Sequence, residues 1–412
     1  MIDSRLVGAF AALLCSAAAA AHGPAVSRYR VNELPVPDSL SAACLSAYSR
    51  GASITRINDF GVVNASSFCY TTVDTVNPMI LSTGAIFVAA LWFGAVELPR
   101  TNPGYSYSYT INNRGELFGY ESGTPEGGGL FATKWTLAGG HERIFFDPAC
   151  GTIQFQAAVD GNGRYTVGWA LRGDPSLPPP VDELCIKMRW VIRDATGVET
   201  SGPLGGSPAA INIQNVAVGT VDRSGVRYHV PSGQLTVLHA ADSAHSVDPT
   251  DINDLGEVAG RITQNAQPDV FNACDPSVAV RWERDGHERV LPHLPGAVSS
   301  HAFGVGYDGE TVGDSGAGAY CSYTDNSGER AALWEGGRAF DLNTLIPRAA
   351  GITLTYAYAV NRRGQITAGG YVNDEPMTLC PSYQYDSNNG TVSVVTVACH
   401  NTHMFVLTPV GR

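Results

Sequence analysis

A short motif recurs about every 50 residues along this chain, and the recurrence constrains the fold more than any other feature. The motif is an apolar residue, Asn, two variable residues, Gly and a short apolar run, with clear copies at 57–61, 111–115, 252–256 and 360–364. Its Asn position falls at 58, 112, 160, 212, 253, 306 and 361, with Asp at 160 and Gly at 306. A fixed period of this length predicts one supersecondary unit per repeat, stacked on its neighbours.

Each copy of the motif predicts a β-hairpin. Apolar and small residues alternate before the Asn, as at 356–360, and a period of two is typical of a strand. The Asn side chain caps a turn by bonding the backbone two residues on, and Gly supplies the positive φ that the turn needs. A second hairpin in each repeat carries an aromatic residue that we expect in the core, at Trp92, Trp135, Trp190, Tyr228, Trp282, Trp334 and Phe405.

Four short strands in each of seven repeats predict an all-β fold, a seven-bladed β-propeller of four-stranded antiparallel blades. The seventh repeat ends after its third strand, and the N-terminal segment 29–35 resembles a fourth strand such as 289–295. We therefore predict one domain over residues 28–412, closed by the N-terminal strand, which removes two exposed sheet edges. Two β-sandwiches and an open β-solenoid are the alternatives; the uninterrupted period disfavours the first, and the N-terminal strand disfavours the second.

Residues 1–21 are predicted to be a signal peptide. An apolar, Ala-rich stretch follows Arg5 and ends in the small residues 19–21, which suit signal peptidase. No later apolar stretch has the length of a membrane span. We therefore expect a secreted or periplasmic protein without a membrane span.

The cysteines support export. Apart from Cys15 in the signal segment, their number is even, as disulfides in an oxidising compartment require: Cys44, Cys69, Cys150, Cys185, Cys274, Cys321, Cys380 and Cys399. All of them map to the same side of the predicted ring. Pairing them in chain order predicts the disulfides Cys44–Cys69, Cys150–Cys185, Cys274–Cys321 and Cys380–Cys399.

Composition excludes some partners. The chain has 26 basic and 38 acidic residues, a net charge of −12, and only two lysines, Lys134 and Lys187. Because no basic cluster exists to bind phosphates, we expect no nucleic-acid partner. No Cys-x-x-Cys occurs, and the His- and Asp-rich stretch 239–251 is interpreted as a solvated loop rather than a divalent-ion site. No metal or cofactor is therefore expected.

The repeats resemble those of the bacterial extracellular HAF-repeat proteins. The resemblance rests on 252–260, 332–346 and 403–409, where His403-Met404-Phe405 is the nearest match to the His-Ala-Phe triplet on the third strand. The triplet at 301–303 lies on a first strand and is interpreted as coincidence. The resemblance covers most of the chain and implies a propeller-like fold and export, but no particular activity.

The long inserts indicate where a ligand binds. In each blade the turns joining strands one to two and three to four lie on one face of the ring, the turn face, and the other connections lie on the opposite loop face. The inserts, at 170–184, 261–277, 314–330 and 373–402, belong to the loop face, and function concentrates on such loops. Five residues before the Asn position, polar and aromatic side chains predict a ligand site near this face, made of Tyr107, Asp248, His301 and Tyr356. Packing against neighbouring loops is the alternative role for these residues.

We therefore expect a monomeric, disulfide-stabilised binding or interaction scaffold, whose partner is a small molecule, a glycan or a protein. The first alternative is an exported hydrolase or lyase with its active site at the central channel mouth and with Asp248 and His301 as acid and base. The second alternative is a surface-structural repeat protein without a small ligand.

Overall fold

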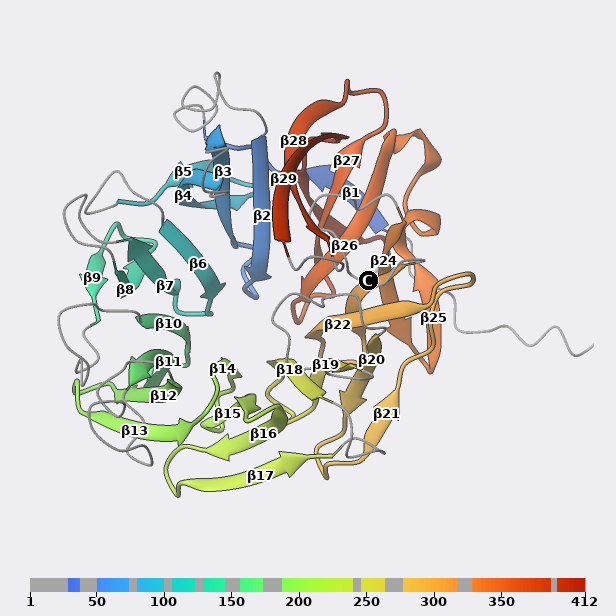
Figure 1. Ribbon diagram of the computed structural model, residues 1–412. Coiled ribbons are helices and arrows are strands. Elements are labelled where there is room, and N and C mark those ends of the chain that lie inside the picture. Colours follow the sequence, from blue (N-terminus) through green and yellow to red (C-terminus); the bar gives the residue numbers. More distant parts are fainter. Residues whose placement is uncertain are drawn as a thin grey trace, which may run out of the picture.

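The computed structural model is a ring of β-sheets around a central channel (Figure 1). It describes residues 29–37, 50–73, 80–99, 106–122, 129–144, 156–172, 187–239, 246–263, 277–316, 328–386 and 391–411. Their strands form seven four-stranded antiparallel sheets, each a blade of a β-propeller. This confirms the predicted fold class and blade number.

Six blades are built from consecutive strands, and the first strand of each lies nearest the channel (Figure 1). Blade 1 contains β2 (Arg50–Ile57), β3 (Val63–Val73), β4 (Ile80–Ala90) and β5 (Gly94–Glu97). Blade 2 contains β6 (Ser106–Ile111), β7 (Glu116–Ser122), β8 (Leu130–Thr136) and β9 (His141–Arg143). Blade 3 contains β10 (Gln156–Gly161), β11 (Tyr165–Arg172), β12 (Lys187–Asp194) and β13 (Glu199–Leu204).

Blades 4 to 6 repeat this order. Blade 4 contains β14 (Pro208–Ile211), β15 (Val216–Val221), β16 (Ser224–His229) and β17 (Gln234–Leu238). Blade 5 contains β18 (Ser246–Ile252), β19 (Val258–Thr263), β20 (Ser277–Trp282) and β21 (Glu288–Val290). Blade 6 contains β22 (Ser299–Val305), β23 (Thr311–Gly316), β24 (Glu329–Glu335) and β25 (Arg338–Asp341), followed by the 3₁₀ turns η2 (Leu342–Thr344) and η3 (Arg348–Ala350).

Blade 7 joins the two ends of the chain, as predicted. It contains β26 (Ile352–Val360), β27 (Ile366–Val372), β30 (His403–Pro409) and the N-terminal strand β1 (Tyr29–Glu33). Strand β1 pairs with β30 from Tyr29 opposite Pro409 to Glu33 opposite Phe405. The ring is therefore closed by backbone hydrogen bonds rather than left with a free edge.

A further hairpin, β28 (Thr378–Asp386) and β29 (Thr391–Cys399), forms the insert of blade 7. Cys399 at its end is buried and disulfide-bonded. In this hairpin Cys380 lies opposite Val397, two positions from Cys399. The register therefore does not identify the partner of Cys399, and the disulfide Cys380–Cys399 stays a prediction. The other predicted disulfides and the segment 1–21 involve positions whose side chains lie outside the described residues.

Tryptophans fill four blades. Trp135, Trp190, Trp282 and Trp334 lie on third strands and are at most 1% exposed. Each indole N–H donates to a backbone carbonyl of a neighbouring blade, such as Trp334 to Pro292 O at 2.7 Å. The prediction for Trp92 is wrong: it is 70% exposed, because β4 ends at Ala90 and Trp92 lies in the following turn. Phe87 occupies the core of blade 1 instead.

Candidate functional site

The repeated asparagines form a hydrogen-bonded belt around the channel at the turn face. In most blades the side-chain amide donates to a backbone carbonyl at the start of the next blade's turn. The contacts are Asn58 to Asn112 O (3.3 Å), Asn112 to Gly161 O (2.8 Å), Asn162 to Asn212 O (2.8 Å), Asn212 to Asn253 O (3.1 Å), Asn253 to Gly306 O (2.7 Å) and Asn361 to Asn58 O (2.9 Å). The motif therefore links blades as well as shaping turns.

Each asparagine also caps its own turn, as predicted. Asn58 Oδ1, for example, accepts the backbone N–H groups of Phe60 and Val62. In blade 3 the residue with this role is Asn162, whose Oδ1 accepts from Arg164 and Tyr165, and not the predicted Asp160. The blade 3 turn is one residue shorter than the others, which displaced the motif in the sequence comparison.

Two residues before the belt, charged side chains face the channel. Arg56 of blade 1 forms an ion pair with Asp251 of blade 5 at 2.6 Å and also donates to Thr250 O. Blades 1 and 5 are not neighbours, so this pair crosses the channel. Asp160 of blade 3 lies within the field of Arg56 and accepts the N–H groups of Gly161 and Ile211.

Burial dominates the electrostatics of Asp160. It raises the pKa of this carboxyl to about 6, against the opposing effects of the two backbone N–H groups and of Arg56. For Arg56, burial lowers the pKa, but the carboxylates of Asp251 and Asp160 outweigh it and the net shift is upward. The channel therefore holds a fixed cation beside a carboxyl that changes charge near neutral pH.

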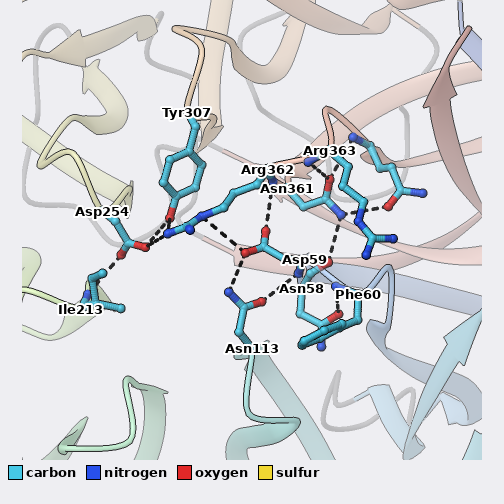
Figure 2. A network of polar contacts seen from close by, with 11 residues as sticks. Asn58, Asp59, Phe60, Asn113, Ile213, Asp254, Tyr307, Asn361, Arg362 and Arg363 are labelled. Carbon is cyan, nitrogen blue, oxygen red and sulfur yellow. Dashed lines mark hydrogen bonds and ion pairs between the residues drawn. The ribbon is translucent and has the colours of Figure 1, made fainter. Parts of the chain in front are cut away.

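One residue after the belt, a second polar network spans the mouth of the channel (Figure 2). Arg362 of blade 7 forms ion pairs with Asp254 of blade 5 at 2.6 Å and with Asp59 of blade 1 at 3.4 Å. The hydroxyl of Tyr307 donates to Asp254, and its ring lies under the Arg362 guanidinium, 4.3 Å from Cζ to the ring centroid. Asn113 bonds the backbone and carboxylate of Asp59, which ties blade 2 into the same network.

The belt, the charged side chains before it and the polar network after it line a cavity of about 250 Å³ at the turn face. Its walls are mainly backbone and polar side chains, and its charged lining residues are Arg56, Asp59, Arg114, Asp160, Asp251 and Asp254. This site was not predicted from the sequence. The available signal was a charged residue two positions before the belt asparagine in repeats 1, 3 and 5, where the other repeats have Thr, Ala or Gly.

The predicted ligand residues lie away from this cavity lining. Asp248 pairs with Arg261 at 3.1 Å, and Tyr107 packs against Tyr109 and Tyr120 in blade 2. His301 and Tyr356 belong to one aromatic row, in which Phe303 of blade 6 stacks on Tyr358 of blade 7. The structure therefore connects His301 with Tyr356 and places Tyr107 and Asp248 in separate contacts. The ligand role of these residues stays a prediction.

His301 is part of a buried polar cluster in blade 6. Its Nδ1 lies 2.8 Å from Asp314 Oδ1, and the two side chains are at most 3% exposed. Glu329 on the next strand adjoins Asp314, and burial first and the charge of Asp314 second raise the pKa of Glu329 to about 8. At pH 7 Glu329 is therefore mainly protonated.

The chain is similar to several solved structures at low sequence identity. The chain is similar to an oligogalacturonate lyase in complex with manganese, at 11% identity and a TM-score of 0.47 over 94% of this chain and 95% of that one. It is similar to a streptogramin B lyase at 12% identity and a TM-score of 0.46, over 93% and 98% of the two chains. A Pyrococcus horikoshii acylaminoacyl peptidase matches at 8% identity and a TM-score of 0.48, over 85% of this chain and 53% of the peptidase.

No protein-family model and no curated protein sequence matches the chain, so the HAF-repeat relation remains a resemblance in motifs. Among the described residues, no helix has the length and apolar character to cross a membrane. In the same part of the chain, no group of three or more His, Cys, Asp or Glu side chains is placed to hold a metal ion.

Proposed function

We propose that the protein is an exported binding scaffold whose ligand is held at the turn-face mouth of the channel. The observation that supports this most strongly is the convergence of polar side chains from non-neighbouring blades, in Arg56 with Asp251 and in Arg362 with Asp254. These groups are held by one another and by backbone N–H groups, so their orientation is set before a ligand arrives. Preorganisation of this kind reduces the entropic cost of binding.

The charge of the cavity favours a neutral or cationic polar ligand. Its lining contains two arginines and four aspartates, so the lining has an acidic excess once Asp160 is ionised. Hydroxyl and amino groups are the complementary partners for carboxylates and backbone carbonyls. A sugar or the amino end of a peptide has this chemistry.

Calorimetric titration of sugars and short peptides against the oxidised, full-length mature protein tests the proposal. Arg362→Gln removes the ion pairs across the mouth, and Arg338→Gln, an exposed change on β25, is the matched control. We expect a ligand whose affinity falls about tenfold in R362Q and is unchanged in R338Q. If the affinity is unchanged in R362Q but binding is lost in Asp248→Ala or His301→Ala, the result would instead support the loop-face site.

A hydrolase or lyase is the second candidate, and one observation favours it. Asp160 has a pKa of about 6 and lies beside Arg56 in the channel, which suits a general acid or base near neutral pH. A screen of glycoside, ester and peptide substrates at pH 5 to 8 tests this candidate. Turnover that persists in Asp160→Asn with an unchanged pH profile would exclude Asp160 as the catalytic group.

A further inference from the structure

A second cavity lies between blades 2 and 3 and is larger than the one in the channel. It measures about 380 Å³, within the range of small-molecule sites. Strands β7, β8 and β9 contribute one wall, and the two turns of blade 3 contribute the other. Because those turns join strands one to two and three to four, the cavity lies at the turn face, toward the outside of the ring.

The base of this cavity is apolar, because Phe118 and Ile144 are buried there. Gly163, with φ of +84°, lies under the side chain of Arg114 from the neighbouring blade. A Cβ at Gly163 would lie 2.5 Å from Arg114 Nη1, so a larger residue there would displace this arginine side chain.

Charges around the cavity do not balance. Its four cations are Arg114, Lys134, Arg164 and Arg193, and its three acids are Glu116, Glu142 and Asp194. Lys134 pairs with Glu142 at 3.0 Å, and Arg114 lies 3.6 Å from Glu116.

The third acid, Asp194, makes its hydrogen bonds within its own turn. Asp194 Oδ1 accepts the N–H groups of Thr196 and Val198 and the Thr196 hydroxyl. Two guanidinium groups, those of Arg164 and Arg193, therefore remain without a hydrogen-bonded or ionic partner among the described residues.

Arg193 is the more informative of the two because it is half-buried on β12. A partly desolvated cation without a counter-charge is costly, and a bound oxyanion would relieve that cost. The planar guanidinium fork matches a carboxylate or a phosphate through two parallel hydrogen bonds.

We propose that the cavity between blades 2 and 3 binds a small molecule that carries an oxyanion group, held by Arg193 and Arg164. The oxyanion lies between the two guanidinium groups, and the rest of the ligand lies over Phe118 and Ile144 at the base. This site is separate from the channel and differs from it in charge preference.

The test uses ¹⁵N-arginine-labelled protein and three probes, benzoate, acetate and inorganic phosphate, at constant ionic strength set with NaCl. Loss of one side-chain Nε–H resonance in Arg193→Gln and another in Arg164→Gln assigns the two signals. Titration should shift both, with benzoate binding more tightly than acetate because its ring also reaches the apolar base of the cavity. Phosphate against benzoate distinguishes a phosphoryl ligand from a carboxylate.

The variants make the result decisive. Arg193→Gln should weaken probe binding about tenfold, and Arg164→Gln should weaken it less, because Arg164 is exposed. Arg284→Gln changes an exposed arginine on the turn after β20 and should leave binding unchanged. The proposal is overturned if no probe shifts either resonance, or if R284Q and R193Q weaken binding equally. Far-UV circular dichroism and melting curves check that each variant is folded, and R362Q should bind these probes normally, which separates this site from the channel.

Discussion

The seam that closes the ring contains a titratable cluster of His403, Glu33 and Glu375, which we call the latch. His403 on β30 lies 2.7 Å from Glu33 on β1 and 2.5 Å from Glu375 at the base of the blade 7 insert. The imidazole donates to both carboxylates only when both ring nitrogens are protonated. Burial lowers the pKa of His403, but the hydrogen bonds and charges of Glu33 and Glu375 outweigh burial, so the net pKa is raised above 6.5.

The sign of the pH dependence follows from these shifts. Because the folded-state pKa of His403 lies above its unfolded value, the stabilisation is complete below about pH 6.5 and is lost as the pH rises through the folded pKa. Burial raises the pKa of Glu375, but hydrogen bonds from Asn401 and His403 outweigh it and the net pKa falls below 4.5. The Glu375 contribution is therefore present above about pH 4.5 and is lost in more acidic solution. The latch is strongest between about pH 4.5 and 6.5.

The size of the effect is modest. A charge-assisted hydrogen bond contributes about 1.5–3 kcal/mol, and the share of Glu33 is reduced because this side chain is 52% exposed. We expect His403→Gln to lower the free energy of unfolding by about 2 kcal/mol at pH 6. For 412 residues the unfolding entropy is about 0.9 kcal/mol/K, so Tm should fall by about 2 °C.

Scanning calorimetry at pH 6 and pH 8.5 measures this difference. The gap in Tm between wild type and H403Q should be larger at pH 6 than at pH 8.5, because the imidazole loses its proton as the pH rises through its folded pKa. His287→Gln, at an exposed histidine after β20, is the control and should show no such trend. A gap that is equal at both pH values, or larger at pH 8.5, would refute the latch.

Three further predictions concern the core, one turn and the channel. Trp334→Ala should cost about 3–5 kcal/mol of stability, whereas Trp92→Ala should stay within about 0.5 kcal/mol because its side chain is exposed; urea denaturation measures both. Gly163→Ala should destabilise more than Gly139→Ala, because the two glycines have nearly the same positive φ but a Cβ meets Arg114 only at 163; thermal melts that rank them equally would contradict this contact. Burial raises the pKa of Asp160 to about 6, so its ionisation costs stability as the pH rises from about 4 to about 6, by up to about 3 kcal/mol, and Asp160→Asn should remove this slope from the pH dependence of unfolding.

The fold was predictable because its unit repeats. The Asn-x-x-Gly turns at 58, 112, 253 and 361 marked the first hairpin of their blades, and the similarity of 29–35 to a fourth strand indicated the closure. Errors arose where a strand position was assigned from residue types alone. Trp92 follows Ala and Leu like a core residue, but the strand ends two residues earlier.

The site was not predictable in the same way. Arg56 and Asp251 are 195 positions apart, and only the geometry of the closed ring brings them within 2.6 Å. The belt was partly inferable, because an asparagine whose carbonyl caps its own turn still has an amide that needs an acceptor. Which acceptor it meets depends on how far the next blade is rotated, and a single repeat holds no information on that angle.

The belt of asparagines has one gap, between blades 6 and 7. At this gap the belt meets the polar network of Arg362 that spans the mouth of the channel. In blade 6 the Asn position is Gly306, and the Glu310 carboxylate takes over the capping by accepting the N–H of Asp308. A carboxylate caps a turn but has no amide to donate to blade 7, so the belt is open between blades 6 and 7. At this point Arg362 of blade 7 reaches Tyr307 of blade 6 and Asp254 of blade 5. Because an exposed ion pair is weaker and more mobile than a buried amide bond, we infer that this junction is where the mouth deforms most easily when a ligand binds.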